Sequence, residues 1–259
     1  MPVLDVIQSM KPVGLKETVE RAALLDRIDT KFLVSEQELL NVLETWKETY
    51  QVLEIDGTRQ FTYANTYLDT PEFELLRWHL QGRRNRAKCR VRTYVESNEH
   101  MLEVKVKGLR GQTVKYRRST GQDPTAKECS EYLVSSLVDA YENAAVSEVE
   151  PALGAHYRRI TLIAPDFCER ITLDHSLSFE RFDTGETYEL PKNVWIVEKK
   201  SGTGNQADTC PLKMQGLRPM SVSKYVLGMS RLRPEINTNS YRPIHRKLDN
   251  MARTAAATA

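Results

Sequence analysis

The prediction of the fold rests on the stretch RRNRAKCRVRTYVESNEHMLEVKVKGLRGQTVKYRR, residues 83–118. Within it, residues 87–95 alternate strictly between long polar side chains and small or apolar ones. Residues 101–107 and 113–118 repeat this alternation, and the short links between the three runs contain Gly, Asn or Ser. Period-two alternation is typical of a strand with two unlike faces, and such links are typical of hairpin turns. The stretch therefore predicts three consecutive antiparallel strands.

The basic residues of the chain are concentrated in this stretch. It holds twelve Lys and Arg against three Glu, a net charge of +9, whereas the whole chain has a net charge of only +2. The alternation places the long cations of each predicted strand on one face. Such a concentration attracts a polyanion or a phosphorylated ligand. A solvated basic surface is the simpler alternative, and the count alone does not exclude it.

Further strands and helices follow from the same kind of pattern. Alternation predicts strands over residues 30–34, 61–68, 157–163, 170–174 and 194–200. Helices are predicted after a capping box at residues 35–38, from Thr70 with Pro71 in the first helical position, over residues 125–143, and from Ser221. One domain is expected over residues 1–236. Residues 237–259 are basic and then rich in Ala and Thr, and we expect them to form a disordered tail.

The charged strand faces restrict the architecture. If the apolar faces pack against helices, the cationic faces either point to solvent or line an enclosed space. Closure removes the sheet edges, but inward cations then need anions or carboxylates to offset repulsion and lost hydration. The acids available for this are Asp29, Glu103, Asp174 and Glu198. The predicted fold class is therefore α+β, a closed antiparallel β-tunnel of about eight strands with a polar, basic lumen and flanking helices.

Carboxylates beside phosphate-binding cations also suggest a metal. Glu198 and Lys200 lie two residues apart on one predicted strand face. Mg²⁺ and Mn²⁺ bridge carboxylate and phosphate oxygens, so this mixture predicts a polyphosphorylated substrate with a divalent metal. Aromatic residues are not interleaved with most of the basic positions, so nucleic acid is a less favoured partner.

Composition excludes several other classes of protein. The chain has 259 residues, of which 40% are hydrophobic, and it contains no apolar run of the roughly 20 residues that cross a bilayer. Its first residues show no secretory signal pattern. The four cysteines are widely spaced and form no C-x-x-C pair. We therefore expect reduced thiols, no membrane segment in this chain and a cytoplasmic location.

Six short motifs resemble one family. They are RIDTKFLV (27–34), NTYLDTP (65–71), KCRVR (88–92), LEVK (102–105), VEKKS (197–201) and SVSKYVLGM (221–229). In this order they resemble the VTC (vacuolar transporter chaperone) domain, the polyphosphate polymerase family of the triphosphate tunnel metalloenzyme superfamily. The resemblance implies an enzyme that transfers the γ-phosphate of ATP to a growing polyphosphate chain, with Mn²⁺ or Mg²⁺. It therefore implies ATP and inorganic polyphosphate as partners.

The resemblance also implies roles for particular residues. Glu198 would be the metal ligand. Tyr157, Arg170 and Lys200 would bind substrate, while Arg158, on the other face, would be a surface residue. The residues that would contact the transferring phosphates are Lys31, Arg90, Arg92, Lys105, Lys115, Arg159 and Lys224. The alternatives are purely structural. Arg90 and Arg92 would pair with Glu103, Lys200 with Glu198, and Arg170 and Asp174 would be paired structurally. Lys31 would be an exposed strand lysine and Lys224 a lysine on a helix surface.

Two features distinguish this chain from relatives in the superfamily. Hydrolases of the superfamily carry Glu-x-Glu-x-Lys on the first strand, whereas this chain has a single acid, Asp29, before Lys31. This argues against a triphosphatase with two metals. The chain also resembles the stand-alone bacterial form, without the regulatory domain or membrane helices of eukaryotic relatives. A hydrolase of tripolyphosphate or nucleoside triphosphates and a non-catalytic polyphosphate-binding module are the alternative functions.

Overall fold

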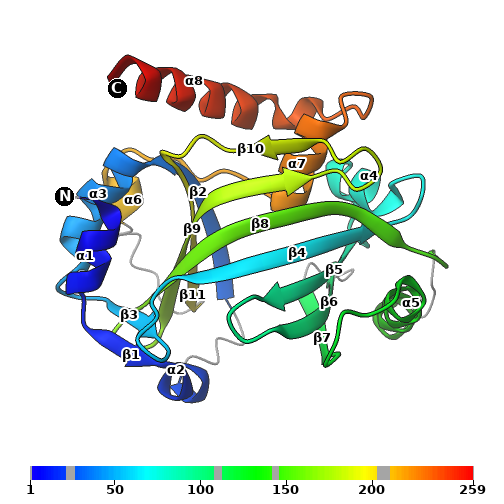
Figure 1. Ribbon diagram of the computed structural model, residues 1–259, viewed down its shortest axis with the longest axis horizontal. Coiled ribbons are helices and arrows are strands. Elements are labelled where there is room, and N and C mark those ends of the chain that lie inside the picture. The colour runs from blue at the N-terminus through cyan, green and yellow to red at the C-terminus, as the bar shows by residue number, and fades with distance from the viewer. Residues whose placement is uncertain (1, 22–26, 108–112, 142–145, 203–210, 259) are drawn as a thin grey trace.

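The computed structural model describes residues 2–21, 27–107, 113–141, 146–202 and 211–258. Its main feature is one strongly curled sheet (Figure 1), in which eleven strands are found among these residues. The order of its eight principal strands is β2 (Arg27–Ser35), β11 (Val194–Gly202), β9 (Glu169–Glu180), β8 (Glu150–Ile163), β4 (Phe61–Asp69), β5 (Ala87–Tyr94), β6 (Glu99–Lys107) and β7 (Thr113–Ser119). All of these neighbours pair antiparallel.

Three short strands join this sheet, two at the bottom of Figure 1 beside a short helix and one near the top. Strand β3 (Gln51–Glu54) pairs with β8 and, in parallel, with β1 (Pro12–Gly14). Strand β10 (Thr187–Glu189) pairs antiparallel with the end of β9. Helix α2 (Leu15–Arg21) follows β1 directly.

The basic hairpins form as predicted. Strands β5, β6 and β7 are consecutive and antiparallel, and Glu103 on β6 lies between Arg90 on β5 and Arg117 on β7. The first predicted turn joins β5 to β6, with Asn98 at a positive φ of 51°. The second predicted turn, residues 108–111, lies outside the described residues. The sequence alternation therefore determines which side chains share a face of these three strands.

The predicted closure of the sheet is wrong at the level of hydrogen bonding. Within the described part of the chain, β2 and β7 are the two ends of the strand order and do not pair with each other. The outer edge of β2 is instead bonded to the segment around Met220, because Met220 N donates to Lys31 O at 2.8 Å. The edge of β7 carries Lys115 and Arg117, and charged edges resist strand pairing. The curl nevertheless brings the two ends close, since Lys105 Nζ lies 3.9 Å from Asp29 Oδ2.

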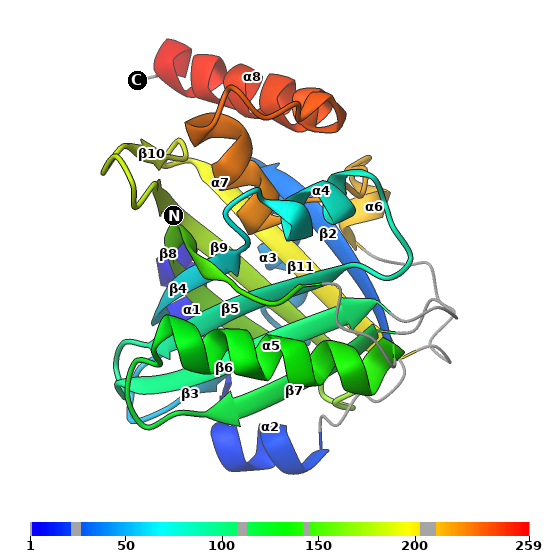
Figure 2. The same ribbon diagram turned by 90° about the vertical axis from the view of Figure 1, so that its right-hand side faces the viewer.

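Helices cover the outer face of the sheet (Figures 1 and 2). Helices α1 (Val3–Ser9), α3 (Glu36–Trp46) and α6 (Pro211–Met214) share an apolar core with the outward residues of β2, β8, β9 and β11. Helix α5 (Ala126–Tyr141) packs on β5 and β6. The predicted capping box is confirmed, because Ser35 Oγ accepts from Glu38 N and Glu38 Oε2 accepts from Ser35 N.

Helix α4 (Glu74–Leu80) begins later than the sequence predicts. Pro71 lies in a turn and not in the first helical turn, and Phe73 adopts a left-handed conformation before the helix. The buried carboxylate of Asp69 accepts from Leu75 N and Leu76 N at 2.8 and 2.9 Å. This side chain satisfies the first free N–H groups of the helix and so determines its start.

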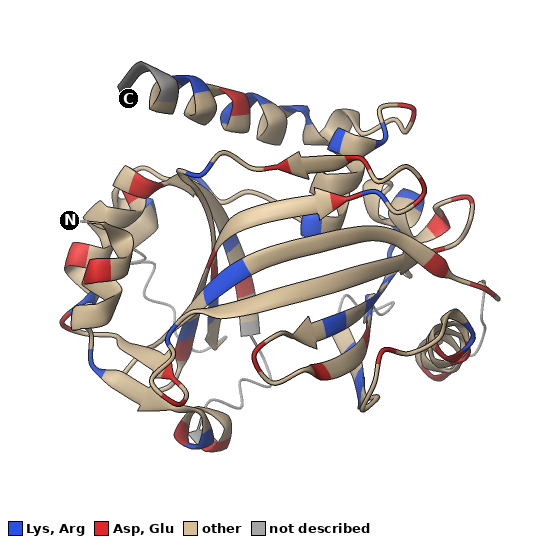
Figure 3. Ribbon diagram, in the orientation of Figure 1, with Lys and Arg blue, Asp and Glu red and all other residues tan. Residues whose placement is uncertain are grey.

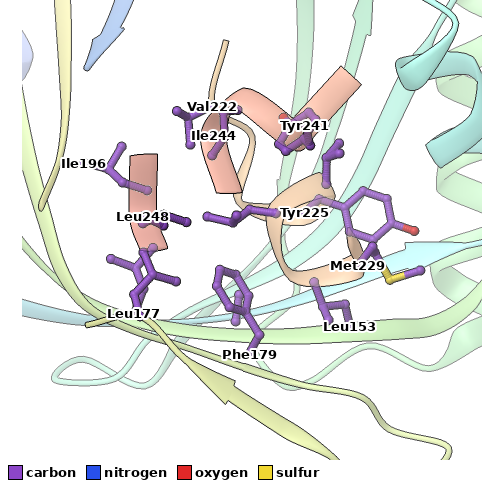
Figure 4. Packing of buried hydrophobic residues seen from close by; sticks show 14 of the residues in the cluster. Leu153, Leu177, Phe179, Ile196, Val222, Tyr225, Met229, Tyr241, Ile244 and Leu248 are labelled. Carbon is purple, nitrogen blue, oxygen red and sulfur yellow. The ribbon is translucent and has the colours of Figure 1, made fainter. Parts of the chain in front are cut away.

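Helix α7 (Lys224–Leu232) packs against the opposite, inner face of the sheet (Figure 4). Its Tyr225 and Met229 pack in one cluster with Leu153 and Phe179 from the strands, and Figure 4 shows these side chains converging. Gly228 allows the close approach, because a Cβ at this position would lie 2.6 Å from both Leu153 and Phe179. One part of the inner face is thus filled by apolar side chains.

The expected disordered tail is also wrong. The short 3₁₀ helix η1 (Asn239–Tyr241) leads into helix α8 (Arg242–Thr258), which covers α7. Its Ile244, Leu248 and Met251 are buried in the same cluster as α7. Their spacing of four and three residues places them on one face of a helix. The pattern is weak in the sequence because the residues around them are mostly basic, polar or Ala. The packed structure therefore extends past the expected domain boundary at residue 236.

The packing of α7 predicts the effect of a change at its glycine. Gly228→Val should lower the free energy of unfolding by about 1–3 kcal/mol, because the added side chain overlaps Leu153 and Phe179. Urea unfolding followed by circular dichroism measures this. Ser230→Val on the same helix, at a half-exposed position, is the control and should have a clearly smaller effect. Equal effects of the two substitutions would contradict the close packing of α7.

Candidate functional site

The inner face of the sheet collects charged side chains from several strands. On β5, Cys89 and Val91 point outward into the core beneath α5, so Arg90 and Arg92 point inward. On β9, Ile171 and Leu173 belong to the outer core, so Thr172 and Asp174 point inward. Figure 3 shows the basic and acidic positions along these strands. Strand alternation thus converts local sequence patterns into one charged surface.

Glu103 is the centre of the first charge cluster. It is 2% exposed, and its carboxylate lies 2.6 Å from Arg90, 2.6 Å from Lys115, 3.1 Å from Arg117 and 3.6 Å from Arg92. Burial by itself would raise the pKa of Glu103, but Arg90, Arg92 and Lys115 outweigh burial and hold that pKa well below its usual value. Glu103 therefore remains ionised and holds four cations from two neighbouring strands.

Asp174 is the centre of the second cluster. This buried carboxylate accepts two hydrogen bonds from Arg159, at 2.6 and 2.8 Å, and one from Lys224 at the start of α7. Burial opposes its ionisation, yet Arg159 and Lys224 lower the pKa of Asp174 well below normal. The contact between Asp174 and Lys224 joins residues 50 positions apart and fixes α7 to the sheet.

Glu198 is the centre of the third cluster. One of its oxygens lies 3.7 Å from Lys31 and the other 3.3 Å from Lys200. Burial raises the pKa of Glu198, but Lys200 and Lys31 outweigh it and the net shift is strongly downward. Lys31 also donates to Val222 O at 3.1 Å, so it connects Glu198 with the segment before α7.

A row of tyrosines lies between the arginines. Tyr63 is stacked on Tyr157 with 5.3 Å between ring centroids and contacts Tyr94 edge-on. The guanidinium groups of Arg92 and Arg159 lie 5.3 and 5.0 Å from the centre of the Tyr63 ring. Planar guanidinium groups over aromatic faces are held in a definite orientation. The tyrosines therefore orient two arginines whose forks face the inner surface.

The hydroxyl group of Tyr157 is an exception to normal hydrogen bonding. It is buried and has no hydrogen-bond partner among the described residues. Burial raises the pKa of this phenol, but Arg159, Arg92 and Lys224 outweigh burial and lower it. An anionic acceptor would satisfy this buried hydroxyl, because the cations around it attract negative charge.

Cations exceed carboxylates on this surface. The interactions among the described residues of this surface involve ten cations, Lys31, Lys88, Arg90, Arg92, Lys105, Lys115, Arg117, Arg159, Lys200 and Lys224, and four carboxylates, Asp29, Glu103, Asp174 and Glu198. Ten against four leaves an excess of six positive charges. Such a surface binds polyvalent anions with several phosphate-like groups.

The structure brings most of the predicted site residues together. Each of the seven expected phosphate contacts, and Lys200 as well, belongs to one of the three charge clusters or to the Lys105–Asp29 pair. The ring of Tyr157 lies beside Arg159 and Lys224 of the second cluster. Arg170 faces Lys200 in the β9–β11 register. Arg158 is exposed, as expected. The pairs that offered a purely structural explanation, of Arg90 and Arg92 with Glu103 and of Lys200 with Glu198, are present in the ligand-free protein. Their roles toward a ligand remain predictions.

Several residues of the site did not stand out in the sequence. Lys88 and Arg117 extend the cation rows, and their alternation with Arg90 and Lys115 could have indicated them. Tyr63 and Ser223 carry no local signal, because their roles depend on neighbouring strands and on α7. Asp69 was part of a recognised motif, but its contact with Tyr225 Oη at 2.6 Å spans 156 positions.

The donor set is compatible with a hard divalent cation. No group of three or more His, Cys, Asp or Glu in the described residues could hold a metal by itself. Glu198 offers carboxylate oxygens beside the cationic surface, and Mg²⁺-type ions are commonly held by one or two carboxylates with substrate phosphates. The side chains thus fit a metal that arrives with, or is completed by, a phosphate ligand.

Comparison with known proteins identifies the family. The model of the VTC domain matches residues 26–233, most of the chain and all of the strands that carry the charge clusters. The chain belongs to the VTC domain family. A comparison of this VTC domain with curated proteins finds no match.

Solved structures resemble the VTC domain only distantly. HpAC1 from Hippeastrum, a proposed adenylyl cyclase with a dominant triphosphatase activity, is 15% identical, with a TM-score of 0.47 over 79% of this chain and 95% of its own. A proposed adenylate cyclase from Vibrio parahaemolyticus is 14% identical, with a TM-score of 0.42 over 78% of this chain and 97% of its own. At these scores neither similarity supports an argument about function.

Every helix among the described residues is too short or too polar to cross a bilayer.

The Glu103 cluster predicts a large effect on stability. Glu103→Gln should lower the free energy of unfolding by about 3–5 kcal/mol, because four cations lose their shared buried carboxylate. Chemical unfolding measures the change. Glu99→Gln, at an exposed position of the same strand, is the matched control and should be nearly neutral. Similar small effects for both would show that the cluster does not stabilise the fold.

Two lysines of the charged surface, Lys115 and Lys200, predict a pH dependence of anion binding. Burial lowers the pKa of Lys115 and of Lys200 to about 8, although Glu103 and Glu198 partly oppose this. A bound polyanion favours the charged lysines and raises these pKa values, so binding takes up protons near and above pH 8. The affinity for tripolyphosphate should therefore fall as the pH rises from about 8 to 10.

Calorimetry in two buffers of different ionisation enthalpy measures the proton uptake directly. Lys200→Arg keeps the positive charge at all these pH values, so this variant should show a weaker pH dependence than the wild type. Release of protons on binding, or an affinity that does not change across this range, would contradict the prediction.

Proposed function

We propose that this VTC domain is an ATP-dependent polyphosphate polymerase that transfers the γ-phosphate of ATP to a growing polyphosphate chain. The observation that carries the proposal is the excess of six cations on one inner face, next to a single carboxylate suited to a metal. A row of phosphates is a ligand whose repeated charge matches such a surface. The activity proposed is the one that the sequence motifs imply for this family.

Phosphate recognition would depend on the arginines and lysines of the three clusters. The guanidinium forks of Arg90, Arg92 and Arg159 can each donate two hydrogen bonds to one phosphate group. Arg90 and Arg92 are oriented by Glu103 and Arg159 by Asp174, and the guanidinium groups of Arg92 and Arg159 also lie over the Tyr63 ring. Lys31, Lys105, Lys115, Lys200 and Arg170 would add positive charge along the chain of phosphates. Preorganised donors lose little freedom when the ligand binds.

Glu198 would hold the divalent ion, Mn²⁺ or Mg²⁺. When bound, such an ion neutralises charge on phosphate oxygens. The contacts of Lys31 and Lys200 with Glu198 keep its carboxylate ionised and ready to bind a cation. These lysines would turn to the substrate phosphates once the metal takes their place.

The transfer step would depend mainly on positioning and charge. An oxygen of the terminal phosphate of the chain forms a bond to the γ-phosphorus of ATP, and the bond from that phosphorus to ADP breaks. Arg159 on β8 and Lys224 at the start of α7 both contact Asp174, and from there they can stabilise charge on the transferring oxygens. Tyr157 Oη can donate to one of these oxygens. The attacking phosphate is already ionised near neutral pH, so no general base is needed.

Product analysis separates the possible activities. Purified protein is incubated with γ-labelled ATP and Mn²⁺, and the products are resolved on a gel. Long ladders of labelled phosphate would support the polymerase. Labelled orthophosphate alone would indicate a hydrolase, and absence of turnover with retained polyphosphate binding would indicate a binding module. Either of the last two results would overturn the proposal.

Neighbouring arginines on β8 provide a matched test of the site. Arg159→Ala should lower kcat by about 10²–10³-fold, because it removes a fixed donor to the transferring oxygens. Arg158→Ala, one residue away on the exposed face, should leave kcat within about twofold. Glu198→Gln should also abolish turnover while the circular dichroism spectrum is unchanged. Full activity of the Arg159 and Glu198 variants would show that the site is assigned wrongly.

A further inference from the structure

Lys88 differs from the other cations of the inner face. Each of the other nine has a carboxylate within 4.0 Å. Among the described residues, Lys88 has none. Its ammonium group instead contacts Ser223 Oγ at 2.9 Å and His79 Nε2 at 3.4 Å. Neither neighbour supplies the negative charge that would offset a half-buried cation.

Four cations near Lys88 oppose its positive charge. Lys31 on β2, Lys105 on β6, Arg90 on β5 and Arg86 before β5 all repel it, and with burial they hold the pKa of Lys88 well below its usual value. His79 on α4 cannot compensate, because burial lowers its pKa to about 3 and leaves it neutral. A lysine in this place weakens the ligand-free fold.

Holding the segment before α7 does not explain the charge. Ser223 is already fixed by its backbone, because Ser223 N donates to Tyr241 Oη at 2.9 Å. The Tyr241 hydroxyl also donates to Ser221 O at 3.1 Å, and Lys31 donates to Val222 O. A neutral side chain on β5 could bond the Ser223 hydroxyl equally well. The positive charge of Lys88 is therefore left without a structural reason.

We propose that Lys88, together with Lys31 and the Ser223 hydroxyl, forms a subsite for one phosphate group where the segment before α7 crosses the inner face. In the ligand-free protein, Ser223 Oγ takes the place of a phosphate oxygen on Lys88. A bound phosphate accepts from Lys88 and Lys31 and supplies the missing negative charge. The inference rests on the proposed function and adds a phosphate position at the β5 side of the surface, where Lys31 connects it with the Glu198 cluster.

The test uses a substitution that removes the charge and keeps the length. Lys88→Met should leave the melting temperature of the ligand-free protein unchanged or raise it, because repulsion with Lys31 and Lys105 is relieved. The same variant should bind tripolyphosphate about tenfold more weakly in calorimetry, and tripolyphosphate should raise its melting temperature less than it does for the wild type. Replacement of a lysine with a purely structural role would instead lower the melting temperature and leave the affinity unchanged.

Three further variants serve as controls. Lys88→Arg keeps the charge and should bind tripolyphosphate within about threefold of the wild type. Ser223→Ala removes the contact with the serine but not the ammonium group, so its loss of affinity should be smaller than that of Lys88→Met. Lys199→Met lies on the outer face, where Lys199 pairs with Glu169, and it should leave the affinity unchanged.

The outcomes separate this inference from the proposed function. If Lys88→Met binds tripolyphosphate like the wild type while Arg90→Met does not, the subsite is overturned and the cationic surface stands. Weaker binding of tripolyphosphate but not of ATP would assign the subsite to the polyphosphate chain, and the reverse would assign it to the nucleotide. Wild-type protein that binds neither anion would overturn both proposals, whereas binding without turnover would overturn only the polymerase.

Discussion

The electrostatic balance of the inner face is the constraint on which this structure depends. A curled sheet directs cations from six of its strands and from α7 toward one another, and such cations repel each other and lose hydration. Three buried or nearly buried carboxylates, Glu103, Asp174 and Glu198, make this arrangement stable. They are too few to neutralise it. The surplus positive charge is what a polyvalent anion would complete.

The position of α7 is the second determinant of the site. Its apolar side chains fill one part of the inner face, and Gly228 permits the contact with Leu153 and Phe179. Lys224 at its start is thereby held against Asp174, and Ser223 against Lys88. The buried Asp69, which starts α4, also bonds Tyr225 on α7. The hydrophobic core and the charged surface are thus two parts of one face, and α7 belongs to both.

Much of the fold and most of the site residues could be predicted because their signals are local. Alternation in residues 87–118 predicts the β5–β6–β7 hairpins, and the motifs indicate Arg90, Arg92, Arg159 and Glu198. The misses have physical reasons as well. Composition predicts a disordered tail where helix α8 forms, because only three of its apolar side chains that the structure describes are buried, and they are spread among basic residues and alanines. The start of α4 was misplaced because Asp69, and not Pro71, determines it.

By itself, the sequence determined which side chains share a face, because the period of a strand is a property of consecutive residues. It also determined the excess of cations in residues 83–118 and the family to which these motifs point. Tertiary structure alone decided which carboxylate holds which cation. It also decided that β2 and β7 do not pair with each other within the described residues, and that Lys88 contacts Ser223, which lies 135 positions further along the chain. These contacts depend on strand order, on the curl of the sheet and on the placement of α7, none of which is encoded within a single segment.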